Sequence, residues 1–196
     1  MENFGTKLEN VIIKSFTILR NNDSGSRLKF PTYRNGQRRV SEQELRFVFV
    51  EQLQDLLKEY DFFYSIETPT NGKYKFSENG KYVIPQVCKN GQSASFDLSI
   101  TDKNGKMVAI IEFKAKNANP HEYAKDFCKL WNPEEKSCYK YFVNLFEKIE
   151  NSTKKSFGGK ITPERNKWIG EKKSSEKIIV MAQSLRENDP VIKKEI

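Results

Sequence analysis

The sequence has few of the residues that build soft-ligand metal sites or disulfide frameworks. Its 196 residues include one histidine, His121, and three cysteines, Cys88, Cys128 and Cys138. No two cysteines form a C-x-x-C pair, and an odd number at these spacings does not indicate a set of disulfides. We therefore predict buried free thiols. Any metal ion would have to be held mainly by oxygen ligands.

Long hydrophobic runs are also missing. No stretch approaches the ~18–20 consecutive apolar residues that a membrane-spanning helix needs. Glu2, Asn3 and Lys7 interrupt the region where a signal peptide would carry its apolar core. Hydrophobic residues make up 37% of the chain, which is enough for a core, and 31% of residues are charged. We expect a cytoplasmic protein with one domain over residues 1–196 and no membrane partner.

The charge is strongly uneven along the chain, with a net value of +8. Residues 1–40 contain eight basic and three acidic side chains, and residues 151–196 contain eleven and six. Residues 41–70 contain two basic and seven acidic side chains. Basic surface of this kind favours an acidic polymer as partner, although a solvated surface is the alternative. The candidate nucleic-acid contacts are Lys116, Arg38, Arg39, Lys172 and Lys173.

The clearest helix start is at Ser41. Ser41 and Glu44 have the S-x-x-E spacing of a capping box, and an apolar stripe at helical spacing continues to about Tyr60. Upstream, residues 1–20 contain an apolar run that fits a helix or a strand. Residues 21–40 have the Asn, Gly, Ser and Pro content of a loop.

Strand patterns follow the first clear helix. Residues 61–70 predict a strand that ends at Pro69, and residues 74–87 predict a hairpin whose turn is Asn79-Gly80. After a second hairpin, Asn119-Pro120 marks the start of a helix that ends before Asn132-Pro133.

The remaining chain adds one buried strand and several shorter elements. Residues 139–146 predict the buried strand, residues 151–157 and the segment from 162 predict short helices, and residues 178–182 predict a last strand. The charged tail from Arg186 is expected to be loose. This order predicts an α/β (α+β) architecture with a central mixed sheet flanked by helices.

The second hairpin, residues 95–116, contains the candidate chemistry. Alternating apolar residues precede Asn104-Gly105, and a β-branched run follows it. A two-residue type I′ turn at Asn104-Gly105 places Asp97 directly opposite Glu112. Lys114 then shares the face of Glu112, and Lys116 continues it, because side chains alternate with a period of two.

Two carboxylates directly opposite each other destabilise a sheet unless a positive charge compensates. Mg²⁺ is usually held by one or two carboxylates together with waters and phosphate oxygens. Asp97 and Glu112 are therefore candidate ligands for Mg²⁺ or Mn²⁺. The alternative is an exposed sheet face on which Glu112 and Lys114 are incidental neighbours.

The motif Asp97-x14-Glu112-Phe113-Lys114, together with the order of elements around it, resembles the PD-(D/E)XK nuclease superfamily. The resemblance covers residues 41–146 and implies a restriction-endonuclease-like, three-layer core of αβββαβ order, with residues 1–40 and 147–196 as basic additions. It further implies that Asp97 and Glu112 bind the metal ion and that Lys114 orients the attacking water. Phe96 stands where the motif often has proline.

The resemblance also implies that an acidic residue of the first core helix joins the site. Glu44 is the candidate and Glu51 its rival. The expected function is a Mg²⁺-dependent nuclease, with DNA favoured over RNA by the resemblance alone and a homodimer left open. The alternatives are a catalytically silent nucleic-acid-binding module of the same fold and a structural or protein-interaction domain.

Overall fold

The computed structural model describes residues 3–21, 25–162, 166–167, 177–186 and 189–196. The described chain contains four helices and seven strands, in mixed order. The helices are α1 (Phe4–Asn21), α2 (Glu42–Tyr60), α3 (Pro120–Leu130) and α4 (Asn151–Ile161). The strands are β1 (Phe62–Glu78), β2 (Lys81–Val87), β3 (Gln92–Asp102), β4 (Met107–Ala115), β5 (Tyr139–Phe146), β6 (Ile179–Ser184) and β7 (Ile192–Glu195).

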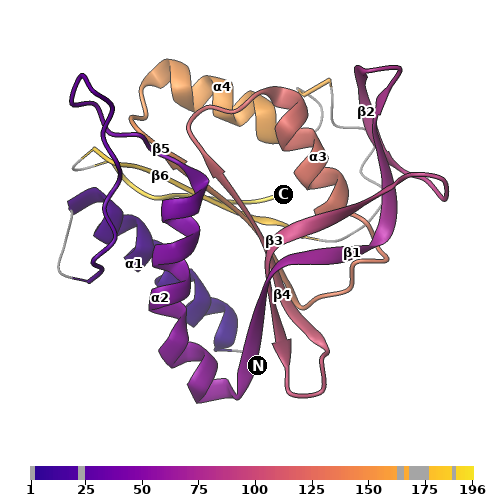
Figure 1. The fold of residues 1–196 in the computed structure, drawn as a ribbon, viewed down its shortest axis with the longest axis horizontal. Helices are drawn as coiled ribbons and strands as arrows, with labels where there is room; N and C mark the ends of the chain where they lie inside the picture. Colours follow the sequence, from indigo (N-terminus) through magenta and orange to yellow (C-terminus); the bar gives the residue numbers. More distant parts are fainter. Residues whose placement is uncertain (1–2, 22–24, 163–165, 168–176, 187–188) are drawn as a thin grey trace.

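The strands form one mixed sheet in the order β2-β1-β3-β4-β5-β6-β7. Strands β1 to β4 pair antiparallel, β4, β5 and β6 run parallel, and β7 returns antiparallel to β6. Helix α3 makes the crossover between β4 and β5, as a parallel pair requires. The predicted central mixed sheet flanked by helices is thus confirmed (Figure 1).

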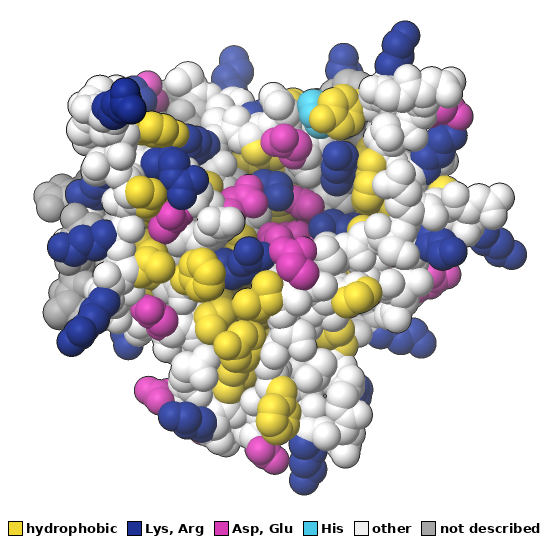
Figure 2. All heavy atoms as spheres, viewed as in Figure 1, with side chains coloured by type: hydrophobic (Ala, Val, Ile, Leu, Met, Phe, Trp, Pro, Cys, Tyr) yellow, Lys and Arg dark blue, Asp and Glu magenta, His cyan; other side chains and the backbone are white. Residues whose placement is uncertain are grey.

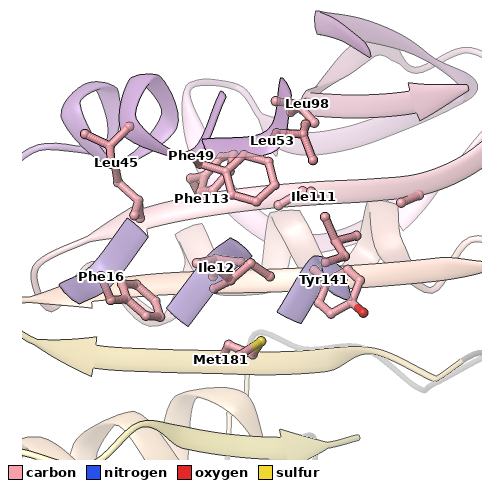
Figure 3. Close-up of a cluster of buried hydrophobic side chains, with 14 of the residues drawn as sticks. Ile12, Phe16, Leu45, Phe49, Leu53, Leu98, Ile111, Phe113, Tyr141 and Met181 are labelled. Atoms are coloured by element: carbon pink, nitrogen blue, oxygen red, sulfur yellow. The ribbon is translucent and has the colours of Figure 1, made fainter. Parts of the chain in front are cut away.

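Helices α1 and α2 pack on one face of the central strands (Figure 3). Ile12 and Phe16 of α1 and Phe49 of α2 are fully buried against side chains of β3, β4 and β5. The rings of Phe49 and Phe113 meet edge to face with centroids 5.4 Å apart. The apolar run in residues 1–20 is therefore a helix, and it belongs to the main core.

Helices α3 and α4 contribute to a second cluster of buried side chains. Tyr123 and Phe127 of α3 and Phe157 of α4 contact the β5 residues Phe142 and Phe146. Helix α3 begins with the expected N-cap, because Asn119 and Glu122 form a reciprocal capping box. The local signals at this helix were sufficient to predict both of its ends.

Strand β1 continues well past Pro69, where the sequence predicted its end. Pro69 pairs with Ser95 of β3, and the pairing of β1 with β2 runs from Tyr74 to Glu78 on β1. The outer edge of β1 is open at Pro69, so a missing N–H costs no ladder hydrogen bond there. The downstream hairpin is confirmed, with Asn79-Gly80 as its turn between the paired residues Glu78 and Lys81.

The prediction of a loose tail after Arg186 is wrong. Strand β7 pairs with β6, and Ile192 and Ile196 pack against the second cluster. Lys193 also pairs with Glu9 of α1 across 2.6 Å. Backbone pairing and these apolar anchors order the segment despite its charge. Likewise, α4 runs four residues beyond the predicted Phe157 to Ile161, and the helix predicted from residue 162 falls largely outside the described residues.

All three cysteines are free thiols, as predicted. Their predicted burial is wrong, because Cys138 is exposed and Cys88 and Cys128 are half-buried. Among the described residues, none of the helices has the length and apolar character needed to cross a bilayer.

Candidate functional site

The β3–β4 hairpin has the predicted register but a different turn. Asp102 Oδ1 accepts hydrogen bonds from the N–H groups of Asn104 and Lys106, each at 2.9 Å, and Gly105 alone has a positive φ, of 76°. This is a three-residue turn with glycine in the left-handed region, which replaces the predicted type I′ turn. An irregularity between Ile100 and Thr101 then restores the register, and Leu98 pairs with Ile111.

Continued by one residue beyond the Leu98–Ile111 pair, that register places Asp97 across from Glu112. Asp97 Oδ2 accepts a hydrogen bond of 2.7 Å from the N–H of Phe113, so the carboxylate takes the place of a backbone acceptor. Ile111 and Phe113 face α1 and α2, whereas Ile110 belongs to the cluster on the α3 side. Glu112 and Lys114 therefore point toward α3.

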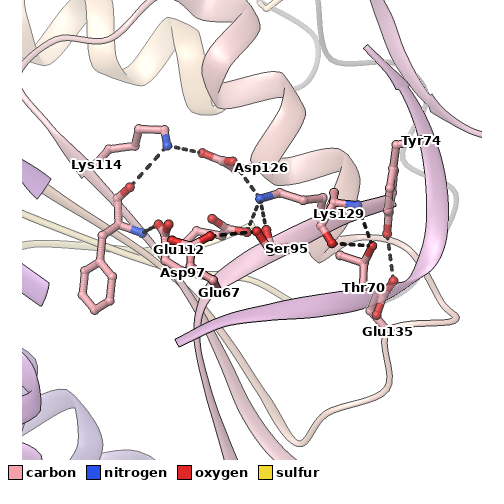
Figure 4. A network of polar contacts seen from close by, with 12 residues as sticks. Glu67, Thr70, Tyr74, Ser95, Asp97, Glu112, Lys114, Asp126, Lys129 and Glu135 are labelled. Carbon is pink, nitrogen blue, oxygen red and sulfur yellow. Dashed lines mark hydrogen bonds and ion pairs between the residues drawn. The ribbon is translucent and has the colours of Figure 1, made fainter. Parts of the chain in front are cut away.

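Helix α3 supplies a buried carboxylate and a buried ammonium to this face (Figure 4). Lys114 Nζ lies 2.8 Å from Asp126 Oδ2, and Lys129 Nζ lies 3.2 Å from Asp126 Oδ1. Lys129 also forms an ion pair with Glu112 and donates a 2.9 Å hydrogen bond to the carbonyl of Ser95. Two lysines and two carboxylates thus alternate across the interface between β4 and α3.

Helix α2 and strand β1 complete the site. Glu42, in the first turn of α2, lies 3.8 Å from Lys114 Nζ. Arg46 pairs with Glu67 at 2.8 Å and lies 3.9 Å from Asp97. Glu67 has a φ of 52°, a left-handed conformation that is costly for a residue other than glycine, and a 2.8 Å hydrogen bond from Ser95 Oγ helps to hold it.

We call this set of eight side chains the charge cluster. Its members are Glu42, Arg46, Glu67, Asp97, Glu112, Lys114, Asp126 and Lys129. Figure 2 shows acidic and basic side chains gathered near the middle of one face of the molecule. Five acidic members stand against three basic ones, so the fully ionised cluster has an excess of two negative charges.

Burial and neighbouring charges shift the pKa values of the carboxylates in the charge cluster in different directions. Burial raises the pKa of Glu112 well above its usual value, with a partial offset from Lys129 and a further rise from Asp126. Burial also raises the pKa values of Asp97 and Glu42. Burial works in the same direction on Asp126, but Lys114 and Lys129 outweigh it and hold that pKa below normal. The ionised form is therefore least favoured at Glu42, Asp97 and Glu112.

Both lysines of the cluster remain cations. Burial would lower the pKa of Lys114, but the charges of Asp126 and Glu42 outweigh it, and the pKa is raised. Lys129 behaves in the same way, with Glu112 and Asp126 outweighing its burial. Lys114 therefore supplies fixed positive charge in this state and is a poor general base.

The glutamate of α2 that reaches the site is Glu42. The sequence predicted Glu44, with Glu51 as its rival, and did not single out Glu42. Glu44 is buried away from the cluster, in contact with Ser41 and 3.2 Å from Arg39. Ser41 is the N-cap of α2, although its hydroxyl bonds to the Glu44 carboxylate and makes no side-chain hydrogen bond to the helix backbone. Glu51 is exposed further along α2. The contacts of the Glu44 carboxylate are therefore at the start of α2, and its part in the site stays a prediction.

The predicted nucleic-acid contacts lie in several places. Lys116 is exposed just after the end of β4, with a φ of 61°, so the strand alternation does not carry it onto the face of Lys114. Arg38 is exposed in the loop before α2, and Arg39 is engaged with Glu44. Lys172 and Lys173 lie outside the described residues.

Sequence reasoning missed Asp126 and Lys129. They are three residues apart on α3 and stand among the apolar residues that form its buried face, Tyr123, Phe127 and Leu130. A charged pair at this spacing inside an apolar stripe was the available signal, because buried charges need partners. The sequence of the helix alone does not show which strands or helices carry the partners of this charged pair.

The donor set is compatible with a divalent cation, with Asp97 and Glu112 as its ligands. Among the residues that the structure describes, no group of three or more Asp, Glu, His or Cys side chains is arranged to hold a metal ion. Two carboxylates with waters and phosphate oxygens are nevertheless a usual Mg²⁺ environment. Glu112 Oε1 is buried and accepts no directed hydrogen bond, although Lys129 contacts it. An additional positive charge beside it would also relieve the excess negative charge.

Comparison of this chain with protein-family models, curated proteins and solved structures gives no significant match.

Proposed function

We propose that this protein is a metal-dependent nuclease that hydrolyses phosphodiester bonds of nucleic acid at the charge cluster. The observation that carries the proposal is the β3–β4 register, in which Leu98 pairs with Ile111, so that Asp97 falls across from Glu112 one residue further on, with Lys114 on the same side as Glu112. This arrangement concentrates poorly compensated carboxylates beside a fixed ammonium group. DNA as the preferred substrate rests on the resemblance to the PD-(D/E)XK superfamily.

The order of elements supports the same proposal. Helix α2, strands β1, β3 and β4, helix α3 and strand β5 follow one another as in the αβββαβ core of restriction-endonuclease-like proteins. In this interpretation β2 is an added edge strand, and α1, α4, β6 and β7 extend the core. The strained backbone at Glu67 lies beside Asp97, and strain of this kind concentrates at functional sites.

Each protein group has a distinct task in the proposed reaction. Asp97 and Glu112 would hold a Mg²⁺ or Mn²⁺ ion, which supplies charge neutralisation at the phosphate and an activated water. Lys114, kept protonated by Asp126 and Glu42, would bind a phosphate oxygen and stabilise the charge that develops on it. The Lys129 ammonium lowers the pKa of buried Glu112, and so it offsets part of the rise that burial causes.

A second candidate function is supported by Lys129 itself. The sequence argument for a metal ion was that opposed carboxylates need a cation, and the Lys129 ammonium already pairs with Glu112. A catalytically silent nucleic-acid-binding module of the same fold would keep this arrangement without a metal ion.

Cleavage assays separate the two candidates. Labelled single- and double-stranded DNA and RNA are incubated with the protein and Mg²⁺ or Mn²⁺, and with EDTA as a control. We expect metal-dependent cleavage that falls by at least about 100-fold in Asp97→Asn, Glu112→Gln and Lys114→Met. Glu44→Gln is the matched control, since it changes a buried carboxylate outside the cluster, and it should retain activity.

The outcomes have separate meanings. Cleavage that persists in EDTA, or full activity in Glu112→Gln, contradicts the nuclease assignment. Binding of nucleic acid without cleavage of any substrate supports the silent module.

A further inference from the structure

We propose that β2 and α3 form a stacking platform for an unpaired nucleotide beside the charge cluster, so that the substrate is single-stranded or contains unpaired bases. The inference deepens the proposed function and rests on it for the identity of the polymer. The platform consists of Phe76, Tyr82, His121 and Lys125. These residues come from the β1–β2 hairpin and from the outer side of α3.

The platform holds an exposed aromatic ring in a defined orientation. The rings of Tyr82 and His121 stack with centroids 3.9 Å apart and planes inclined by 28°. Lys125 Nζ lies 5.1 Å from the centre of the Tyr82 ring and 5.6 Å from that of Phe76. Tyr82 is nevertheless 51% exposed.

The Tyr82 ring is contacted by two side chains of α3, His121 and Lys125, and still exposes about half of its surface. His121 and Lys125 are four residues apart on α3, so they project from the same side of the helix. Both therefore approach Tyr82 from α3 and hold its ring in place. An aromatic ring held in this way needs no reorganisation to receive a base, and stacking is open to every base because each has a π-face.

The platform is close to the charge cluster because both use α3. Five residues separate His121 from Asp126, which corresponds to about 7.5 Å along the helix. This distance is that of roughly two stacked nucleotides at 3.4 Å each. Figure 2 shows the chain's single histidine beside hydrophobic side chains on the same face as the acidic and basic groups of the cluster. A base on Tyr82 would thus lie beside the same helix that supplies Asp126 and Lys129 to the charge cluster.

The charge of the hairpin fits the backbone of the same ligand. Residues 71–90 contain four lysines and one glutamate, in contrast to the acidic segment that precedes them. The lysines are Lys73, Lys75, Lys81 and Lys89. A groove of positive charge combined with an aromatic platform is the usual arrangement for binding single-stranded nucleic acid. A protein partner would use the apolar area of Tyr82 but would have no need for these lysines.

The test measures binding without cleavage. Wild-type protein and variants are titrated in EDTA with a fluorescent single-stranded DNA of about 12 nucleotides, a length within the usual site size for such binding. We expect Tyr82→Leu to weaken binding about tenfold, because base stacking is lost, and Tyr82→Phe to bind like the wild type. Tyr64→Leu is the matched control, since Tyr64 is 38% exposed on the other end of β1.

An abasic oligonucleotide of the same length separates stacking from structural effects. If Tyr82 stacks a base, wild type and Tyr82→Leu will bind the abasic strand equally. The proposal is overturned if Tyr82→Leu binds the normal strand as tightly as wild type, or if it loses affinity equally for both strands. Because EDTA removes catalysis from the assay, failure of the nuclease proposal would not alter this result.

Discussion

At the scale of single residues, the ammonium of Lys129 supplies the positive charge that two opposed carboxylates need. The opposition of Asp97 and Glu112 demanded a positive charge, and the structure supplies one from α3, 17 residues after Glu112. Lys129 also pairs with Asp126, which in turn contacts Lys114. A lysine that neutralises two buried carboxylates is expected to stabilise the fold strongly, because removal of one partner leaves buried charge unpaired.

Lys129→Met should therefore lower the free energy of unfolding by about 3–5 kcal/mol. Lys125→Met is the control, because Lys125 lies on the same helix and its ammonium contacts the aromatic rings of Phe76 and Tyr82. Urea denaturation followed by circular dichroism measures both. Equal losses in the two variants would show that the charge of Lys129 is not the cause.

The Lys129→Met variant also tests whether Glu112 binds a metal ion. If Glu112 is a metal ligand, Mn²⁺ should raise the melting temperature of Lys129→Met more than that of the wild type, because the ion replaces the missing positive charge. An identical Mn²⁺ shift in both proteins would argue against Glu112 as a ligand.

At the scale of elements, two Asn-Gly sequences form different turns. Asn79 and Gly80 have φ values of 49° and 73°, the pattern of a type I′ turn, and the loop between Glu78 and Lys81 has two residues. In the β3–β4 hairpin only Gly105 has a positive φ. The difference comes from Asp102, whose carboxylate accepts two backbone N–H groups and stabilises a longer turn.

The two turns should respond differently to alanine. Asn79→Ala places alanine in the left-handed region and should cost about 1–2 kcal/mol of stability, whereas Asn104→Ala should be nearly neutral. Gly105→Ala is a further check. Because no atom lies within 4 Å of its added Cβ, any loss reports only the positive φ. Equal stability of Asn79→Ala and Asn104→Ala, measured by urea denaturation, would contradict this account.

At the scale of the whole molecule, the charge cluster and the chain carry net charges of opposite sign. The chain has a net charge of +8, yet the charge cluster carries more acidic than basic groups. The β1–β2 hairpin with its lysines lies at the opposite end of β3 from the β3–β4 turn (Figure 1). This separation allows the basic surfaces to be tested independently.

Binding to single-stranded DNA should weaken as salt rises, because each phosphate contact releases counterions. Changing Lys73 and Lys81 to glutamine should reduce the slope of log affinity against log salt by about 1.4, or ~0.7 per contact. The control pair is Lys103 and Lys106, which are equally exposed on the β3–β4 hairpin. A fluorescence anisotropy titration at several salt concentrations measures the slopes. Equal slopes from the two pairs would contradict a binding role for the β1–β2 hairpin.

The sequence by itself determined the features that depend on neighbouring residues. The N-cap of α3, the Asn79-Gly80 turn, the buried strand at residues 139–146 and the register that sets Asp97 across from Glu112 all follow from local patterns. The last of these was right although the predicted turn was not, because the irregularity at Ile100 restored the same pairing. Local hydrogen bonds and the two-residue alternation of a strand act over a few residues, and so a sequence displays them.

Only the tertiary structure decided which charges meet. Glu42, Asp97 and Asp126 come from three different elements, and their approach depends on how α2 and α3 pack on opposite faces of the sheet. The order of β7 beside β6 and the continuation of β1 through Pro69 likewise depend on which sheet edges are available. Ion pairs and sheet edges join residues that are distant in the chain, and a single sequence contains no measure of those distances.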